Sequence, residues 1–166
     1  DITIDPAGSA TAGQPVTVES RQAQSGAHQI VIAFTSAVSS AQFPTVTAAA
    51  GVTSLPVATA FNGNEMTVTI GSAGTPVADG ARVTVSATGV GTAAGVNPSV
   101  VVAFLLGDVD GSRQVTGTDI NATKSSAATG TVNASTFRRD VNVDGNISGT
   151  DVNVVKSRAA SSTGPI

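Results

Sequence analysis

The sequence predicts two modules of different fold class, an all-β sandwich over residues 1–106 and a small all-α module over residues 107–166. Three observations predict this division. Short runs rich in Val, Thr and Ile recur through the first part, the last third of the chain contains a duplication, and six of the eleven acidic residues gather within that duplication. Because aromatic residues make up only 3% of the chain, we expect Val, Ala, Ile and Leu to fill both cores.

The first 106 residues contain seven runs with the length and composition of β-strands. In residues 66–70 and 83–86, apolar and hydroxyl residues alternate, which indicates strands with one buried and one solvated face. Residues 62–64, Asn-Gly-Asn, predict a tight hairpin because Asn and Gly tolerate a positive φ. Seven short strands in about 105 residues are typical of a β-sandwich, and we expect an immunoglobulin-like arrangement. The runs are residues 15–19, 29–34, 45–48, 56–61, 66–70, 82–87 and 100–104, with 2–4 as a possible eighth.

Composition excludes several classes of function. Eight Lys and Arg residues against eleven acids supply no basic patch, so we expect no nucleic-acid partner. No apolar run approaches the roughly 18 to 20 residues that span a bilayer. The chain has no Cys and a single His, so it lacks the residues of a zinc site and any clear nucleophile and base pair, and we expect no enzymatic activity. Any metal site must therefore use oxygen ligands.

The last third of the chain repeats itself at a shift of 32 residues, with ten identities in the 22 aligned positions that begin at residue 108. Six acidic residues fall within two twelve-residue stretches, loop one (residues 108–119) and loop two (residues 140–151). Like charges crowded into one loop repel each other at short range. The sequence therefore predicts that each loop encloses a cation.

The spacing of oxygen-bearing residues in each loop matches the EF-hand rule for calcium, with side chains at positions 1, 3 and 5, a carbonyl at 7, a water at 9 and a carboxylate at 12. Loop two has Gly145 at position 6, where the chain turns sharply, whereas loop one has Arg113 there and a neutral ligand, Ser112, at position 5. We therefore expect two calcium sites, of which site one binds more weakly. The predicted ligands are Asp108, Asp110, Ser112, the Gln114 carbonyl and Asp119 in loop one, and Asp140, Asn142, Asp144, the Asn146 carbonyl and Asp151 in loop two, with Thr116 and Ser148 at the water position.

A single helix is predicted after each loop. Ile120, Thr123 and Ala127 form one narrow apolar stripe at helical spacing, and Val152, Val155 and Ala159 form its equivalent in the second repeat. Between the repeats, Asn133 can cap a short helix over residues 134–139. No helix is predicted before loop one, because residues 100–106 have the pattern of a strand.

A loop followed by one helix, twice, with Asp at position 12, is the arrangement of type I dockerin domains, which residues 107 to about 160 resemble. The resemblance rests on residues 107–111 and 140–145 with their partners Asp119 and Asp151. It implies calcium-dependent binding to a cohesin module, and so a fragment of a larger, extracellular or cell-surface bacterial protein of the kind involved in polysaccharide degradation. In that family, partner choice is associated with loop positions 10 and 11 and helix positions 17 and 18. Those positions, with the Asn residues between them, are Gly117, Thr118, Asn121, Lys124, Ser125, Gly149, Thr150, Asn153, Lys156 and Ser157.

Two functions remain open. In the first, the chain is a non-catalytic interaction module that tethers its parent protein to a cohesin-type partner through either of two similar helix faces. In the second, calcium only stabilises the dockerin-like part, which packs on its own β module as a rigid spacer or terminus of a surface protein. Only Gly107 separates the strand-like residues 100–106 from loop one, so we expect no flexible linker and contact between the modules.

Overall fold

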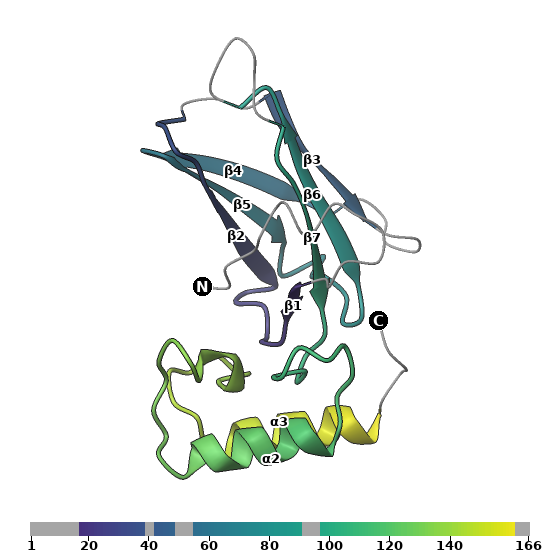
Figure 1. Cartoon of the computed structure of the whole chain (residues 1–166). Coiled ribbons are helices and arrows are strands. Elements are labelled where there is room, and N and C mark those ends of the chain that lie inside the picture. Colours follow the sequence, from purple (N-terminus) through teal and green to yellow (C-terminus); the bar gives the residue numbers. More distant parts are fainter. Residues whose placement is uncertain (1–16, 39–41, 49–54, 91–96, 162–166) are drawn as a thin grey trace. The chain divides into compact units, whose positions relative to one another are not determined.

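The computed structural model describes residues 17–38, 42–48, 55–90 and 97–161 (Figure 1). These residues form two compact units that are not continuous in the sequence. The first contains residues 23–78 and 82–102, and the second contains Thr17–Gln22, Asp79–Ala81 and the chain from Ala103 onward. The predicted run at residues 2–4 and the beginning of the run at 15–19 lie outside the described residues.

Seven strands are present among the described residues, and each coincides with one of the seven predicted runs. The prediction that the N-terminal part is all-β is thereby confirmed. The strands form a four-stranded sheet of order β1-β7-β6-β3 and a three-stranded sheet of order β2-β5-β4. Their bounds are β1 (Thr17–Glu19), β2 (Ala27–Ala33), β3 (Gln42–Ala48), β4 (Val57–Asn62), β5 (Glu65–Gly71), β6 (Arg82–Thr88) and β7 (Ser99–Phe104).

Strand β5 lies at the centre of the three-stranded sheet, and its sequence alternates because one of its faces is buried and the other is wetter. Met66, Val68 and Ile70 are fully buried, while the Thr residues between them are half-buried. Strand β5 pairs antiparallel with β2 and with β4. The hairpin predicted between β4 and β5 is confirmed, because Asn62 pairs with Glu65 and the intervening Gly63 has a φ of 60°.

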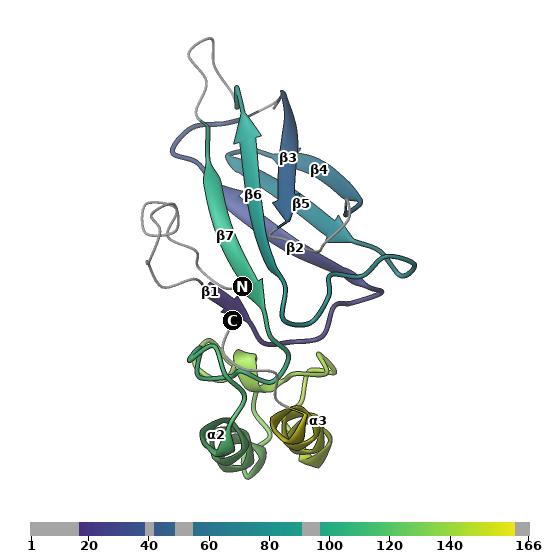
Figure 2. The same cartoon turned by 90° about the vertical axis from the view of Figure 1, so that its right-hand side faces the viewer.

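The C-terminal part contains two helices, α2 (Gly117–Ala127) and α3 (Gly149–Ala160), which pack side by side (Figure 2). Each follows one of the loops, as predicted. Val115 and Ile147, at position 8 of their loops, are buried, as is Val155 in α3. Among the described residues, no helix is sufficiently long and apolar to pass through a membrane.

Two details of the helical part differ from the prediction. The short helix between the repeats is η1 (Phe137–Arg139), a single 3₁₀ turn, because the Asn133 side chain accepts hydrogen bonds from the backbone N–H and hydroxyl of Ser135 and holds that segment in a turn. In α2, Asp119 and Ser126 are the residues buried with Thr123, whereas Ile120 and Ala127 are only half-buried. Asp119 is buried because it belongs to the loop as well as to the helix, and it accepts hydrogen bonds from loop backbone N–H groups.

Candidate metal centre

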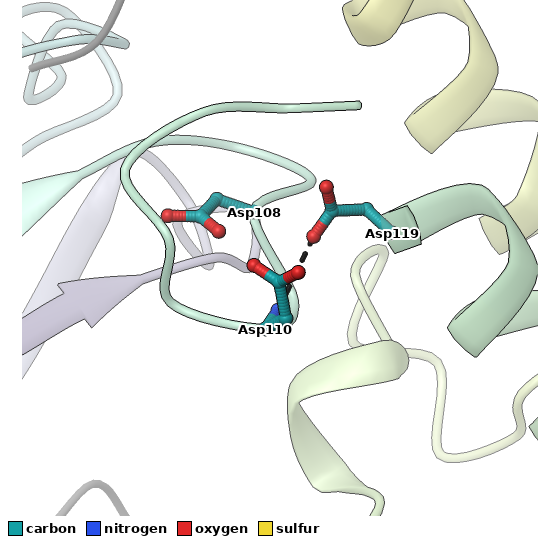
Figure 3. Close-up of side chains that lie close together, drawn as sticks. All are labelled: Asp108, Asp110 and Asp119. Carbon is teal, nitrogen blue, oxygen red and sulfur yellow. Dashed lines mark hydrogen bonds between the residues drawn. The ribbon is translucent and has the colours of Figure 1, made fainter. Parts of the chain in front are cut away.

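Three carboxylates converge in loop one (Figure 3). Asp108 and Asp110 follow β7 in the loop itself, and Asp119 lies in the first turn of α2. One oxygen from each carboxylate lies within 4.8 Å of the other two. Asp108 and Asp119 are fully buried while Asp110 is exposed, so the cluster has a closed inner side and an open outer side. Within the described ranges, no other group of three acidic or histidine side chains lies so close together.

Backbone N–H groups of the loop hold the two buried carboxylates in place. Asp108 accepts hydrogen bonds from the backbone N–H groups of Ser112 at 3.0 Å and Arg113 at 2.8 Å. Asp119 accepts from those of Val109 at 2.9 Å and Thr116 at 2.8 Å. Each oxygen of Asp108 accepts one of these bonds and keeps a second lone pair for a cation, whereas Asp119 Oδ1 also accepts from the Asp110 N–H at 3.2 Å, so the bonds fix the direction of both acids.

The electrostatics of loop one favour a bound cation. Burial raises the pKa of Asp108 to about 6, against the opposing hydrogen bond from Arg113 and with a further contribution from Asp110 and Asp119. Although its own partial burial opposes the change, the pKa of Asp110 is lowered by hydrogen bonds from Ser112 and Thr118. Negative charge is therefore held in a place where water compensates it poorly. A divalent cation fits this donor set, which consists of oxygen atoms alone.

Loop two repeats the hydrogen-bond pattern of loop one. Asp140 accepts from the backbone N–H groups of Asp144 at 3.1 Å and Gly145 at 3.0 Å. Asp151 accepts from those of Asn142 at 3.2 Å and Ser148 at 2.9 Å. Asp108 makes the same pair of bonds in loop one, and Asp119 accepts from Thr116 and, at 3.2 Å, from the backbone N–H of Asp110, the residue equivalent to Asn142. The duplicated sequence therefore folds into two loops with the same internal geometry.

The remaining predicted ligands lie in the same loops. In loop one, the Ser112 hydroxyl donates to the Gln114 carbonyl at 3.2 Å, which places two predicted ligand oxygens side by side. In loop two, Asp144 accepts from the Asn142 amide at 2.8 Å and from the Asn146 N–H at 2.9 Å. All of these interactions use side-chain or carbonyl oxygens of the kind that calcium prefers.

Positive φ values occur at positions 4 and 6 of both loops. In loop one they belong to Gly111 at 76° and Arg113 at 68°, and in loop two to Val143 at 60° and Gly145 at 88°. Each loop thus has one Gly and one other residue in the left-handed region. We expected a positive φ at Arg113 but not at Val143, and only the comparison of Val143 with Gly111 across the repeat could have indicated it.

Position 12 of each loop is also the third residue of the following helix. Thr116 is the N-cap of α2, and it forms a capping box with Asp119. Ser148 and Asp151 form the same box at α3. Thr116 and Ser148, which were predicted at the water position, are therefore also the residues at which the helices begin. This double role accounts for Asp at position 12, because a short carboxylate reaches back to the N-cap backbone N–H while its other oxygen faces the loop.

The ten residues predicted to bind a partner are all exposed on or beside the two helices. Five belong to α2 and five to α3, at equivalent positions of the two repeats. None of them lies in the core, whose helical side chains are instead Thr123, Ser126, Val152 and Val155. They are Gly117, Thr118, Asn121, Lys124 and Ser125 in α2, and Gly149, Thr150, Asn153, Lys156 and Ser157 in α3.

One part of this unit was not foreseen from the sequence. The segment Thr17–Gln22 belongs to the same compact unit as the two loops, although it precedes loop one by more than eighty residues. The Ser20 carbonyl accepts from the Gly107 N–H at 2.9 Å, and the backbone N–H of Gln22 donates to the Val141 carbonyl at 2.7 Å. No local signal reveals such contacts, because backbone groups make them at long range.

The comparison with known families identifies the duplicated segment. The family model of the dockerin type I domain matches residues 106–158. The match confirms the dockerin part of the resemblance and leaves the β-rich part unassigned. Dockerin domains in general are non-catalytic modules that bind calcium and cohesins, and proteins that contain them are typically extracellular or cell-surface bacterial proteins. No curated protein and no solved structure matches the chain.

Proposed function

We propose that this chain is a non-catalytic pair of modules that tethers a secreted or cell-surface parent protein to a cohesin-type partner. The observation that carries the proposal is the pair of equivalent loops, each of which has a buried Asp at its first position and a second buried Asp in the first turn of a helix. The helices then present equivalent exposed residues at the family's partner-binding positions. Calcium binding and partner binding are in this way linked through the loop–helix junctions.

Each loop is proposed to hold one calcium ion. In loop one, the ligands are Asp108, Asp110, Ser112, the Gln114 carbonyl and Asp119. In loop two, they are Asp140, Asn142, Asp144, the Asn146 carbonyl and Asp151. The ion supplies positive charge that compensates the buried carboxylates. The chain itself supplies the backbone N–H groups that orient those carboxylates before the ion arrives. We expect site one to bind more weakly, since its position 5 is the neutral Ser112 and its position 6 is Arg113.

The partner surface is proposed to be duplicated. Lys124 and Ser125 occupy the same positions in α2 as Lys156 and Ser157 in α3, and all four side chains are exposed. A cohesin-type partner can therefore dock on either helix face in two related orientations. The tethered parent protein belongs to the bacterial exterior, in a setting such as polysaccharide degradation.

The β-rich module is proposed to be an immunoglobulin-like sandwich over residues 1–106 that acts as a spacer. Support comes from the seven strands, the two sheets, and the alternation of buried and half-buried residues in β5 and β6. The dockerin-like module then spans residues 107–166. Neither module is proposed to carry a catalytic centre, since the chain has no Cys and a single His.

Calorimetric titration of calcium into the chelator-treated full chain tests the calcium part of the proposal. We expect about two sites in the wild type, with Asp119→Asn removing only site one and Asp151→Asn removing only site two. The two variants are matched, because each changes position 12 of one loop and leaves the other loop intact. No heat of binding together with an unchanged unfolding temperature would refute calcium binding.

A second function is favoured by one observation, the membership of Thr17–Gln22 in the calcium-loop unit. In this alternative, calcium only stabilises the dockerin-like part, which packs on its own β module as a rigid spacer or terminus. Binding assays with a panel of type I cohesin modules, with calcium and with chelator, separate the two. Calcium-dependent capture of a cohesin supports tethering, whereas calcium-dependent stability without any cohesin binding supports the structural alternative.

A further inference from the structure

A short segment far from the calcium loops in the sequence is an integral part of their unit. We call the segment Thr17–Gln22 the strap; it contains β1 and lies outside the residues that match the dockerin family. Val18 and Ser20 in the strap are 1% and 0% exposed. Its buried polar groups have specific partners, which lie at the starts of the two loops.

The strap bonds to the chain immediately before loop one. The backbone N–H of Leu105 donates to the Glu19 carbonyl at 3.0 Å, and that of Gly107 donates to the Ser20 carbonyl at 2.9 Å. Gly107 is adjacent to Asp108, the first predicted ligand. The path of the chain into loop one is therefore held by two strap carbonyls.

The strap also bonds to both sides of the first ligand of loop two. The Ser20 hydroxyl donates to the Arg138 carbonyl at 3.0 Å, and the backbone N–H of Gln22 donates to the Val141 carbonyl at 2.7 Å. These two carbonyls flank Asp140 in the sequence. One segment of six residues thus bonds to the start of both loops.

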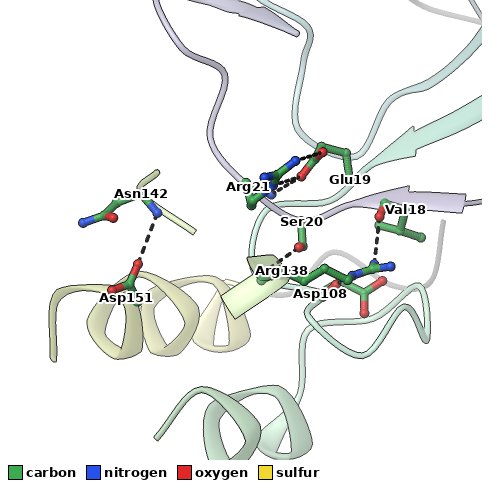
Figure 4. Close-up of polar contacts among 8 residues, drawn as sticks. All are labelled: Val18, Glu19, Ser20, Arg21, Asp108, Arg138, Asn142 and Asp151. Carbon is green, nitrogen blue, oxygen red and sulfur yellow. Dashed lines mark hydrogen bonds and ion pairs between the residues drawn. The ribbon is translucent and has the colours of Figure 1, made fainter. Parts of the chain in front are cut away.

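Arg138 connects the strap to loop one through its side chain (Figure 4). Its Nη2 donates to the Val18 carbonyl at 2.8 Å and lies 3.5 Å from the Asp108 carbonyl. The same atom lies 3.4 Å from the place that a Cβ on Gly111 would occupy, so the guanidinium fits against the loop backbone. Its Nε is buried without a hydrogen-bond partner, the one such side-chain atom among the described residues. Burying Nε without a partner costs free energy, while the Nη2 contacts of the same side chain join the strap to loop one.

We propose that the strap holds both calcium loops in their binding conformation, with Arg138 as a positioning residue. The proposal rests on calcium binding by the two loops. Binding to a loop that must first become ordered costs conformational entropy, and fixing the start of the loop removes part of that cost. Calcium affinity at both sites then depends on residues that the dockerin match does not include.

The test is calcium titration by calorimetry on the full chain with Ser20→Ala. This change removes one hydroxyl, alters no charge and leaves every predicted ligand in place. We expect calcium affinity to fall about three- to tenfold, as for the loss of one buried hydrogen bond. The matched control is Ser126→Ala, which removes a buried hydroxyl from α2 that accepts from Arg139 and does not contact the strap. We expect it to leave calcium affinity unchanged.

A second variant, Arg138→Lys, keeps the positive charge and loses the planar group that reaches the Val18 and Asp108 carbonyls. We expect the same direction of change, most clearly at site one, and the variant also serves if Ser20→Ala does not fold. Thermal unfolding in chelator and in calcium completes the test. Weaker calcium binding with a larger loss of unfolding temperature in calcium than in chelator supports the proposal.

Three results would overturn it. Wild-type affinity in both variants would do so while leaving the proposed calcium function intact. Equal losses of unfolding temperature in calcium and in chelator, with unchanged affinity, would show that the strap stabilises the fold without positioning the loops. Failure of the wild-type chain to bind calcium would overturn the proposed function and the strap proposal together.

Discussion

At the scale of single residues, the two loops have positive φ at the same positions but place their Gly at different ones, so a different residue is strained in each loop. Both require a positive φ at positions 4 and 6, and each loop supplies one Gly. Loop one places its Gly at position 4 and strains Arg113, whereas loop two places it at position 6 and strains Val143. A β-branched residue with a φ of 60° is the more costly of the two. Loop two is therefore strained at Val143, although it matches the EF-hand rule better than loop one.

This strain predicts that Val143→Asn stabilises the protein. Asn adopts the left-handed region more readily than Val, so we expect the free energy of unfolding to rise by roughly 0.5–1 kcal/mol. Urea denaturation in chelator, followed by circular dichroism, measures the change. The control is Val143→Thr, which stays β-branched and is expected to give no gain. A gain in Val143→Thr equal to that in Val143→Asn would show that polarity rather than φ is responsible.

At the scale of elements, the unit of this fold is a loop and a helix that share one carboxylate. Asp119 and Asp151 end their loops, start their helices and close a capping box with the preceding Thr116 or Ser148. A sequence rule for calcium loops and a sequence rule for helix starts therefore apply to the same residue. Disturbing the cap is expected to affect both the helix and the metal site.

Ser148→Ala tests this connection. The Ser148 hydroxyl accepts from the Thr150 N–H at 3.2 Å, and its loss is expected to lower the free energy of unfolding by about 1 kcal/mol. We also expect calcium binding at site two to weaken while site one stays unchanged, because Asp151 loses part of its support. Calcium titration and urea denaturation measure the two effects. Ser157→Ala, on the exposed side of the same helix, is the control and is expected to change neither quantity.

The equivalence of the two helices predicts how partner binding responds to mutation. Lys124→Glu or Lys156→Glu alone is expected to weaken binding to a cohesin module only about twofold, since one of two docking orientations remains. Both changes together are expected to weaken it by tenfold or more, since both faces then lose a charged contact. Surface plasmon resonance in calcium measures these affinities.

Arg82→Glu, an equal change of charge on β6, is the control for the two Lys variants and is expected to have no effect. Loss of binding in one single variant, with no effect in the other, would show that a single helix face is used.

At the scale of the whole molecule, compact structure and sequence order do not coincide. The strap and Asp79–Ala81 belong to the unit that contains the calcium loops. Asp79 accepts from the Leu106 N–H at 2.8 Å and pairs with Arg158 at 3.2 Å, so this second insertion also reaches the start of loop one and the end of α3. The Asp79–Arg158 ion pair is partly exposed and contributes little to stability, whereas the hydrogen bond from the Leu106 N–H to Asp79 fixes the chain just before loop one.

Removal of calcium tests the composition of this unit. In chelator, hydrogen exchange is expected to accelerate in residues 103–161 and equally in the strap, because crowded carboxylates without a cation repel each other. Strand β5, whose core side chains belong to the other unit, is expected to keep its protection. Exchange measured by mass spectrometry gives both results in one experiment. A strap that stays as protected as β5 while α3 loses protection would contradict this assignment.

Local patterns in the sequence determined much of this protein. Alternation of apolar and hydroxyl residues located β5 and β6, punctuation by Gly, Pro and Asn located the seven strands, and the 32-residue repeat located both loops with their helices. These features are predictable because each depends on residues that are neighbours in the chain. The same locality explains why the acidic cluster of loop one could be foreseen from its spacing.

Tertiary structure alone decided which distant segments complete the calcium-loop unit. The strap contacts depend on the Ser20 hydroxyl, the Arg138 side chain and backbone groups, none of which has a distinctive pattern in the sequence. The positive φ of Val143 and the burial of Asp119 in α2 were likewise set by the loops as a whole. Packing brings together residues more than a hundred positions apart, and each of these hydrogen bonds joins a side chain to a backbone carbonyl, which every residue has. The sequence thus determined the two loops, and the folded chain determined what holds them.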